Sequence, residues 1–117
     1  MDKQRRKELL EQYKQIKTYF GMIQVKNLMN GKIFIAGYPN LKNKWPSMKA
    51  QLNMGRFYNL ALQKDWTEYG EIHFEYEVLE EIVIEENTDR DWELKKLEQK
   101  WHDKLMPYGD KGYNKPL

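Results

Sequence analysis

The sequence predicts a small α+β domain: a short three-stranded antiparallel sheet flanked by helices, with an extra helix at the N-terminus. Two β-branched runs flank an Asn-Gly pair, and a third alternating run follows at residues 72–79, as expected for antiparallel strands. Elsewhere apolar residues recur at three- and four-residue steps, the period of amphipathic helices. A chain of 117 residues then forms one compact domain whose core needs neither a disulfide nor a metal.

The first helix is expected over residues 2–19, so that residues 1–19 form a basic amphipathic segment in front of a domain at 20–117. Gly21 is placed to end this helix, because glycine readily adopts the left-handed backbone of a C-terminal cap. We expect the helix to dock on its own domain, with nucleic acid or an anionic membrane as the alternative partners. Its apolar stripe consists of Leu9, Leu10, Tyr13, Ile16, Tyr19 and Phe20.

A hairpin over residues 21–37 is expected to organise the domain. Ile23 and Val25 alternate with polar residues, and Ile33 and Ile35 recur with the same period of two. One face of the hairpin is therefore predicted to be buried. Between the runs, Asn30-Gly31 accepts positive φ at both central positions of a type I′ turn.

Two helices follow the hairpin. The first has apolar residues at helical steps, and Pro46 predicts that this helix either starts there or is kinked there. Its apolar residues are Leu41, Trp45, Met48 and Leu52, and Gly55 is its expected end. The second is expected over residues 56–69, ends at Gly70, and has one face formed by Tyr58, Leu62, Trp66 and Tyr69.

The last strand and helix complete the domain. Residues 72–79 alternate, and the residues predicted to face the core are Ile72, Phe74, Tyr76 and Val78. An acidic loop at 84–88 leads to Thr88-Asp89-Arg90-Asp91, which is typical of a capping box. The helix is expected to run to about residue 106 before an irregular tail, with Leu94, Leu97, Trp101 and Leu105 facing inward.

The net charge of +2 conceals two halves of opposite sign. Residues 1–64 hold 13 Lys/Arg and 3 Asp/Glu, whereas residues 65–117 hold 7 Lys/Arg and 15 Asp/Glu. The basic half could follow a phosphate backbone; the alternative is that the two halves offset each other within the fold. The chain has no cysteine and no apolar run of about 20 residues, so we expect a cytoplasmic protein without disulfides, secretory signal or membrane span.

An ordered series of short motifs over residues 20–114 resembles the GIY-YIG nuclease superfamily, the small domain of phage homing endonucleases. The motifs are Gly21-Met22-Ile23, Asn30-Gly31-Lys32-Ile33-Phe34-Ile35, Asn40-Leu41-Lys42, Asn59, Leu62-Gln63, Trp66, Tyr69-Gly70, Phe74, Glu77-Val78-Leu79-Glu80, Glu98, Trp101 and Gly112-Tyr113-Asn114. The resemblance implies a metal-dependent phosphodiesterase. Its usual groups are two hairpin tyrosines, an arginine and a histidine on the next helix, one metal-binding glutamate and a late asparagine.

Matched residue by residue, this implied site is depleted. The two tyrosine positions hold Ile23 and Phe34, which lack a hydroxyl to orient or deprotonate water. The arginine position holds Lys44, which keeps a charge but not the planar fork of a guanidinium. The histidine position holds Met48, which cannot move a proton, and the second triplet has Ala36 in place of glycine.

Glu98 and Asn114 match the implied catalytic set. Glu98 is then the expected ligand of Mg²⁺ or Mn²⁺, since magnesium sites often use one or two carboxylates with water and phosphate. The alternative is a surface carboxylate that pairs with Lys95 or His102. Groups that could rebuild a site are a Glu98–His102 pair and the tyrosines Tyr13, Tyr19, Tyr38 and Tyr58.

Three functions are compatible with these residues. The first is a nucleic-acid-binding domain, for DNA with RNA also open, whose endonuclease activity is lost or weakened. The second is an active divalent-metal-dependent DNA endonuclease that uses Glu98, Lys44 and a non-standard base. The third is a protein-interaction or scaffold domain, monomeric or paired as a homodimer through its oppositely charged halves. For the first, the expected phosphate contacts are Lys26, Lys32, Lys42, Lys44, Lys49, Arg56 and Lys64.

Overall fold

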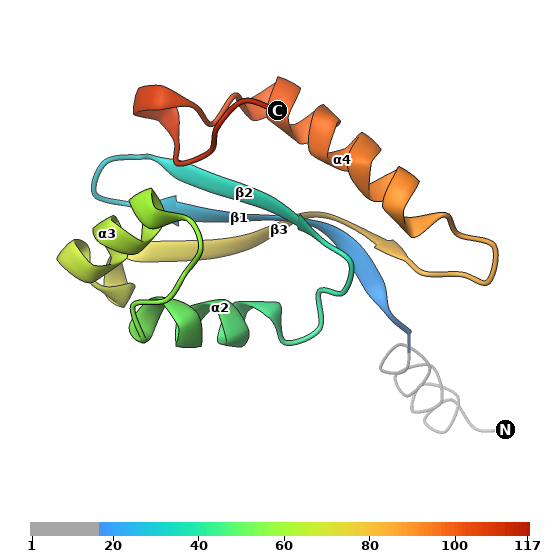
Figure 1. Ribbon diagram of the computed structural model, residues 1–117, viewed down its shortest axis with the longest axis horizontal. Helices are drawn as coiled ribbons and strands as arrows, with labels where there is room; N and C mark the ends of the chain where they lie inside the picture. The colour runs from blue at the N-terminus through green and yellow to red at the C-terminus, as the bar shows by residue number, and fades with distance from the viewer. Residues whose placement is uncertain (1–16) are drawn as a thin grey trace, which may run out of the picture.

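A computed structural model describes residues 17–117 as a sheet with helices on both sides (Figure 1). The elements are β1 (Tyr19–Asn27), β2 (Ile33–Tyr38), α2 (Lys44–Asn53), α3 (Leu60–Tyr69), the 3₁₀ turn η1 (Glu71–His73), β3 (Phe74–Val83), α4 (Arg90–Leu105) and the 3₁₀ turn η2 (Gly109–Lys111). The strands form one antiparallel sheet in the order β2-β1-β3. The predicted α+β class and element order are confirmed for these residues. The helix expected over 2–19 lies outside them except at its end, where Tyr19 and Phe20 belong to β1.

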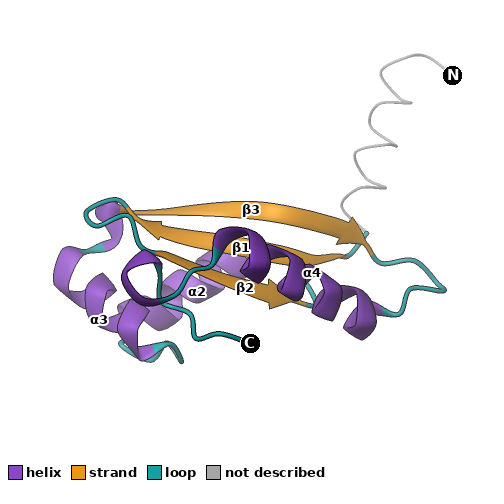
Figure 2. Cartoon of the chain, turned by 90° about the horizontal axis from the view of Figure 1, so that it is seen from above, coloured by secondary structure: helices purple, strands orange, loops and turns teal. Residues whose placement is uncertain are grey.

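Both faces of the sheet are covered, so the prediction of one buried hairpin face is wrong. Helices α2 and α3 cover one face and α4 covers the other (Figures 1 and 2). Val25 pairs with Phe34 across the hairpin, and these two share the α2–α3 face with Ile23. Phe20, Met22, Ile35 and Leu97 form a second core beneath α4. Strands buried on both faces carry apolar residues at successive positions, which removes the period of two that would distinguish the faces.

The hairpin turn is longer than the expected type I′ turn. Residues 28–31 form the loop: the Asn27 N–H donates to the Lys32 carbonyl at 2.9 Å, and the Gly31 N–H donates to the Asn27 carbonyl at 2.8 Å. Of the two turn residues, only Gly31 has a positive φ, +77°. The side chain of Asn30 instead accepts a hydrogen bond from the Lys32 N–H, a local bond that stabilises this wider loop.

A β-bulge divides β3 between the two cores. Ile23 pairs with Val78 and Met22 pairs with Glu80, so Leu79 is the extra residue between them. A bulge reverses the side-chain alternation, and Leu79 packs beneath α4. Phe74 and Tyr76 face the first core as predicted, but Val78 is exposed and Ile72, which lies in η1, is 85% exposed.

The helix termini explain the remaining differences. Helix α2 begins at Lys44, which puts Pro46 in the first turn, where a missing N–H removes no intrahelical bond. Helix α3 begins at Leu60 rather than at residue 56, because the Asn59 side chain caps it, and it ends at Gly70 as predicted. Helix α4 is capped by Asp89, which accepts from the Trp92 N–H, rather than by Thr88. Its four predicted inward residues all pack in the second core.

The tail folds back along β2 as an irregular segment, as predicted. Gly112 forms a parallel bridge with Ile33. A side chain at Gly112 is excluded, because its Cβ would lie 2.4 Å from the Pro107 carbonyl oxygen and 2.5 Å from that of Ile33. Within residues 17–117, no helix combines the length and apolar character needed to cross a bilayer.

The two edges of the sheet differ in charge. Strand β3 carries four glutamates, of which Glu75, Glu77 and Glu81 are exposed. Strand β2, at the opposite edge, has the sequence IFIAGY and no acidic residue. The order β2-β1-β3 therefore separates the acidic edge from the edge beside which the matched site positions lie.

Candidate functional site

The two hairpin positions that correspond to the family tyrosines are in the core. Ile23 is 0% exposed and Phe34 is 2% exposed, and both pack beneath α2 and α3. Met48, at the histidine position, is also buried in this core. These three positions therefore offer no polar group to a ligand at the surface.

Glu98 lies against β2 from the other face of the sheet. A Cβ at Gly37 would be 2.8 Å from Glu98 Oε1, so the absence of a side chain at Gly37 makes room for the carboxylate. Burial raises the pKa of Glu98, and the charge of Lys95 partly opposes this. Within residues 17–117 no hydrogen bond or ion pair holds this carboxylate. A half-buried carboxylate without a partner is unfavourable for folding and is typical of functional sites.

Two tyrosines meet on the α2–α3 side of the same edge. Tyr38 ends β2, Tyr58 precedes α3, and their hydroxyl oxygens are 3.3 Å apart. Burial raises the pKa of both phenols, most strongly that of Tyr38. The charge of Glu98 adds a smaller rise to the pKa of Tyr58. Both phenols are therefore neutral at pH 7 and can donate hydrogen bonds.

Lys44 brings a positive charge to the tyrosine pair. Its Nζ lies 4.0 Å from the centre of the Tyr38 ring, a cation–π contact. No carboxylate forms an ion pair with Lys44 in the described part of the chain. The arginine position thus retains a charge that is available to an anion.

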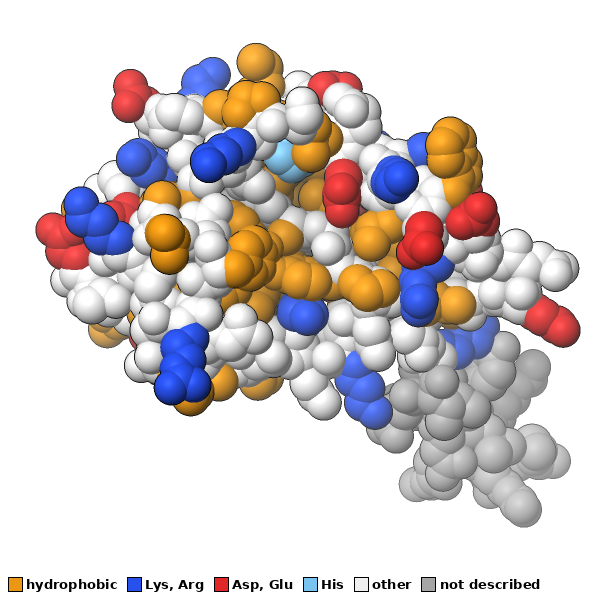
Figure 3. All heavy atoms as spheres, viewed as in Figure 1, with side chains coloured by type: hydrophobic (Ala, Val, Ile, Leu, Met, Phe, Trp, Pro, Cys, Tyr) orange, Lys and Arg blue, Asp and Glu red, His pale blue; other side chains and the backbone are white. Residues whose placement is uncertain are grey.

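Asn114 holds the edge of β2 rather than pointing freely into the site. Its Oδ1 accepts from the Ile35 N–H at 2.9 Å and its Nδ2 donates to the Ile35 carbonyl at 2.8 Å. Beside this contact lies a groove of roughly 460 Å³, whose lining includes Phe34, Tyr58, Asn114 and Lys115. Figure 3 shows apolar side chains gathered along this edge, between α4 and the α2–α3 layer.

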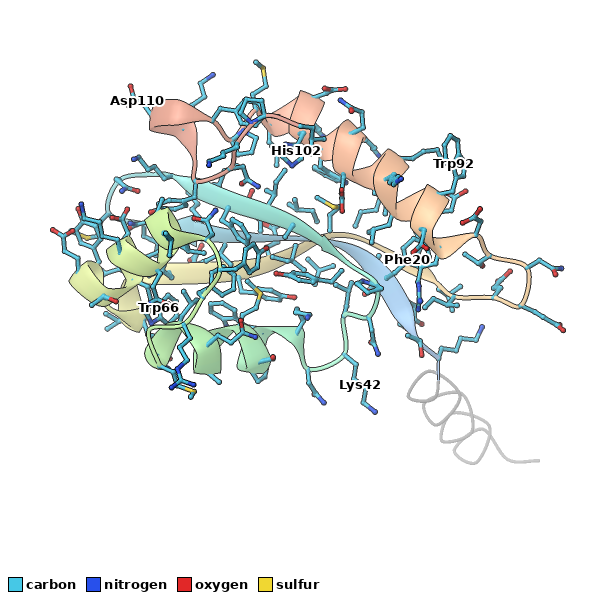
Figure 4. The ribbon with its side chains drawn as sticks, in the orientation of Figure 1. Phe20, Lys42, Trp66, Trp92, His102 and Asp110 are labelled. Atoms are coloured by element: carbon cyan, nitrogen blue, oxygen red, sulfur yellow. The ribbon has the colours of Figure 1, made fainter. Side chains whose placement is uncertain are left out.

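The other candidates are dispersed. Lys26 lies opposite Glu75 in the sheet, and Lys49 forms a 4.0 Å ion pair with Glu71. Lys42 extends into solvent from the loop before α2 (Figure 4). Arg56 and Lys64 are also exposed, and Lys32 lies over the Tyr113 ring. Of the candidate cations in the described part of the chain, Lys44 contacts the tyrosine pair, through the ring of Tyr38.

The Glu98–His102 pair is not formed. His102 is buried, and its Nδ1 lies 2.8 Å from the Tyr108 hydroxyl. Burial lowers the pKa of His102, so this ring is a neutral core group.

A divalent cation fits the site only if the substrate supplies part of its coordination. Among residues 17–117, no group of three or more His, Cys, Asp or Glu side chains is arranged so that it could hold a metal ion. Glu98 could contribute one carboxylate, and phosphate and water would complete the coordination, as is common for Mg²⁺ in proteins.

The sequence did not single out Gly37 or Lys115 for function. Gly37 makes room for the Glu98 side chain, and Lys115 brings a charge to the groove. The available signal for Lys115 was its place directly after Asn114. No sequence pattern indicates that Glu98 approaches Gly37, because the contact depends on how α4 packs on β2.

The three-stranded antiparallel sheet with helices on both faces matches the fold of a homing-endonuclease catalytic domain. The chain is similar to the catalytic domain of the homing endonuclease I-TevI, with 26% identity, a TM-score of 0.66 and coverage of 84% of this chain and 99% of that one. A mutant of the catalytic domain of intron endonuclease I-TevI, with alanine in place of a glutamate, matches with 25% identity, a TM-score of 0.54 and coverage of 82% and 92%.

A curated relative supports the same assignment. Intron-associated endonuclease 1 of Enterobacteria phage T4 is 28% identical over 67 residues, which cover 57% of this chain. The match spans about a quarter of that protein, 27% of its length. No profile of a known protein family matches the sequence.

Proposed function

We propose that this chain is a DNA-binding domain of the nuclease fold whose endonuclease activity is lost or strongly weakened. The observation that carries the proposal is the burial of apolar Ile23 and Phe34 at the two tyrosine positions. Hydrolysis of a phosphodiester requires a group that orients or deprotonates the attacking nucleophile. Neither side chain can do this, whereas Lys44 and Lys115 on the β2 side have the positive charge that a phosphate contact needs.

Binding is expected along the β2 edge. Lys44 and Lys115 bring positive charge to this side, whereas β3 presents glutamates at the opposite edge. Contacts from lysines to phosphates position a protein on nucleic acid without specifying sequence. Affinity should therefore fall steeply with salt, because each neutralised phosphate releases counterions.

A second candidate is a divalent-metal-dependent endonuclease with a non-standard site. It is favoured by the half-buried Glu98 carboxylate beside Gly37, which has no hydrogen-bond or ion-pair partner among residues 17–117. In this function Glu98 would hold Mg²⁺ or Mn²⁺, which supplies stabilisation of charge at the scissile phosphate. Lys44 would bind the substrate phosphate, and the neighbouring Tyr38–Tyr58 pair would donate a hydrogen bond to it.

Cleavage and binding can be separated in one experiment. Supercoiled plasmid and a branched oligonucleotide are incubated with Mg²⁺ or Mn²⁺, and gel-shift lanes are run from the same tubes. The variant is Glu98→Ala, and the matched control is Glu93→Ala, on the same helix but in an ion pair with Lys96.

The outcomes differ for the two functions. A shift without cutting supports a DNA-binding domain that has lost cleavage. Cutting that disappears in Glu98→Ala and persists in Glu93→Ala supports the metal-dependent enzyme. The absence of both cutting and a shift would contradict both functions and leave a protein-interaction domain.

A further inference from the structure

We propose that Tyr38 and Tyr58 form a pair of neutral hydrogen-bond donors that binds one phosphodiester of the nucleic-acid backbone at the β2 edge, next to Lys44. This inference rests on the proposed DNA-binding function and names the groups that carry it. Neither tyrosine occupies one of the two family tyrosine positions, which hold Ile23 and Phe34. Their hydroxyls would therefore replace those that the family places at these positions.

The first step is the location of the two phenols. Tyr58 is 65% exposed and packs edge-on against the ring of Phe34, with 6.0 Å between ring centres. Phe34 itself is 2% exposed. Tyr58 therefore covers the residue that lacks a hydroxyl and brings a hydroxyl to the surface above it. Tyr38 comes to the same place from the end of β2.

The second step is the bond between the two hydroxyls. Their oxygens are 3.3 Å apart, which is long for an O–H···O hydrogen bond, whose usual distance is about 2.7–2.8 Å. Only one of the two protons can take part in this bond, so the hydrogen of the other hydroxyl is left for another acceptor. An anion that accepts from both hydroxyls would replace one weak bond by two bonds to a charged acceptor, which are stronger.

The third step is the charge beside the pair. The Lys44 ammonium lies 4.0 Å from the Tyr38 ring centre, so it is held over that ring, beside the tyrosine pair. A phosphodiester carries one negative charge and two non-bridging oxygens. Lys44 supplies the attraction, and the two phenols supply direction. Burial raises the pKa of both tyrosines, which keeps them protonated as donors.

The prediction is tested by the salt dependence of binding. Affinity for a short DNA duplex is measured by fluorescence anisotropy over a series of KCl concentrations, without divalent metal. The variants are Tyr38→Phe/Tyr58→Phe, which keeps both rings in place, and Lys44→Met. Tyr69→Phe, on α3 in the first core, is the matched control.

Each variant has a distinct expected result. The double phenylalanine variant should bind about tenfold more weakly at every salt concentration. Its slope of log affinity against log salt should equal that of the wild type, because a neutral donor displaces no counterion. Lys44→Met should reduce the slope by about one, and Tyr69→Phe should match the wild type.

Other results would overturn the inference. If the double variant binds as tightly as the wild type, the phenol pair is wrong and the DNA-binding function stands. A changed slope in the double variant would contradict neutral donors. If the wild type does not bind duplex at all, the proposed function fails and this inference fails with it.

A second arm distinguishes nucleic acid from lipid, because a phospholipid headgroup is also a phosphodiester. Binding of the same four proteins to phosphatidylglycerol vesicles is measured by co-sedimentation. Phenol-dependent binding to vesicles, together with phenol-independent binding to duplex, would overturn the assignment to nucleic acid. Loss of duplex binding alone in the double variant supports it.

Discussion

The Tyr113 hydroxyl joins the tail to the hairpin, and its removal tests how the fold is held together. The hydroxyl donates to Asp65 Oδ2 at 2.7 Å and accepts from Asn27 Nδ2 at 3.0 Å. Asn27 is 0% exposed, so water does not replace a lost partner there. Tyr113→Phe deletes one oxygen atom and keeps the ring in the first core.

The expected loss of stability follows from these two bonds. Leaving the buried Asn27 amide without an acceptor costs about 1–3 kcal/mol. The bond to Asp65 adds less, because Asp65 is half-buried and water can solvate its carboxylate. We expect a loss of roughly 2–3 kcal/mol in the free energy of unfolding, or on the order of 10 °C in Tm for a domain of this size.

Urea unfolding followed by tryptophan fluorescence measures this loss. Tyr69→Phe is the control, since this hydroxyl makes no hydrogen bond among residues 17–117. Burial raises the pKa of Tyr113 to about 12, so the hydroxyl donates throughout the neutral range and the loss should not depend on pH there. A loss below about 0.5 kcal/mol, the usual range of surface changes, would refute the reasoning.

Three further changes test other parts of the structure. Gly21→Ala would put a Cβ 2.0 Å from the Glu80 carbonyl oxygen, so it should break the pairing of β1 with β3. The free energy of unfolding, measured in urea, should fall by more than about 3 kcal/mol. Near-wild-type stability would contradict the register of β1 and β3. Asn114→Ala removes both side-chain hydrogen bonds to the Ile35 backbone. It should lower the free energy of unfolding by about 1–2 kcal/mol and speed hydrogen exchange of the Ile35 amide. Unchanged exchange would contradict these two bonds. Burial raises the pKa of Glu98 above its unfolded value, so wild-type stability should fall as pH rises from about 4.3 through the folded-state pKa. Glu98→Gln should abolish that fall and be more stable than the wild type at pH 7 by up to about 0.5 kcal/mol in urea unfolding. A less stable variant at pH 7 would contradict a carboxylate without a partner among residues 17–117.

Local patterns in the sequence were sufficient for the order of the elements. The inward stripe of α4 was predicted because a helix exposes its period of 3.6 directly. The faces of the sheet were not, because β1 and β2 are buried on both sides and a period of two no longer distinguishes Phe34 from Ile35. The bulge at Leu79 was also not predicted, because one inserted residue leaves the local composition of a strand unchanged.

The candidate site residues came from the family resemblance, and their arrangement could not be predicted from the sequence. The family resemblance indicated Glu98, Lys44 and Asn114, yet no local signal placed Tyr58 beside Tyr38, which lies 20 residues away in the chain. The contact of Glu98 with Gly37 depends on the docking of α4, which spacing within one helix does not specify. The role of these residues in binding or cleavage, the cytoplasmic location and the oligomeric state stay predictions.

The contrast between the two edges of the sheet bears on how copies of this chain avoid one another. At β2 the side chain of Asn114 and the bridge from Gly112 already use backbone groups that an incoming strand would need. At β3 no strand of residues 17–117 pairs with the outer edge, and its exposed glutamates keep a second acidic edge away by repulsion. This second protection is electrostatic, so dissolved salt screens and weakens it. High ionic strength would then favour edge-to-edge aggregation through β3, whereas the β2 edge is already covered by the tail.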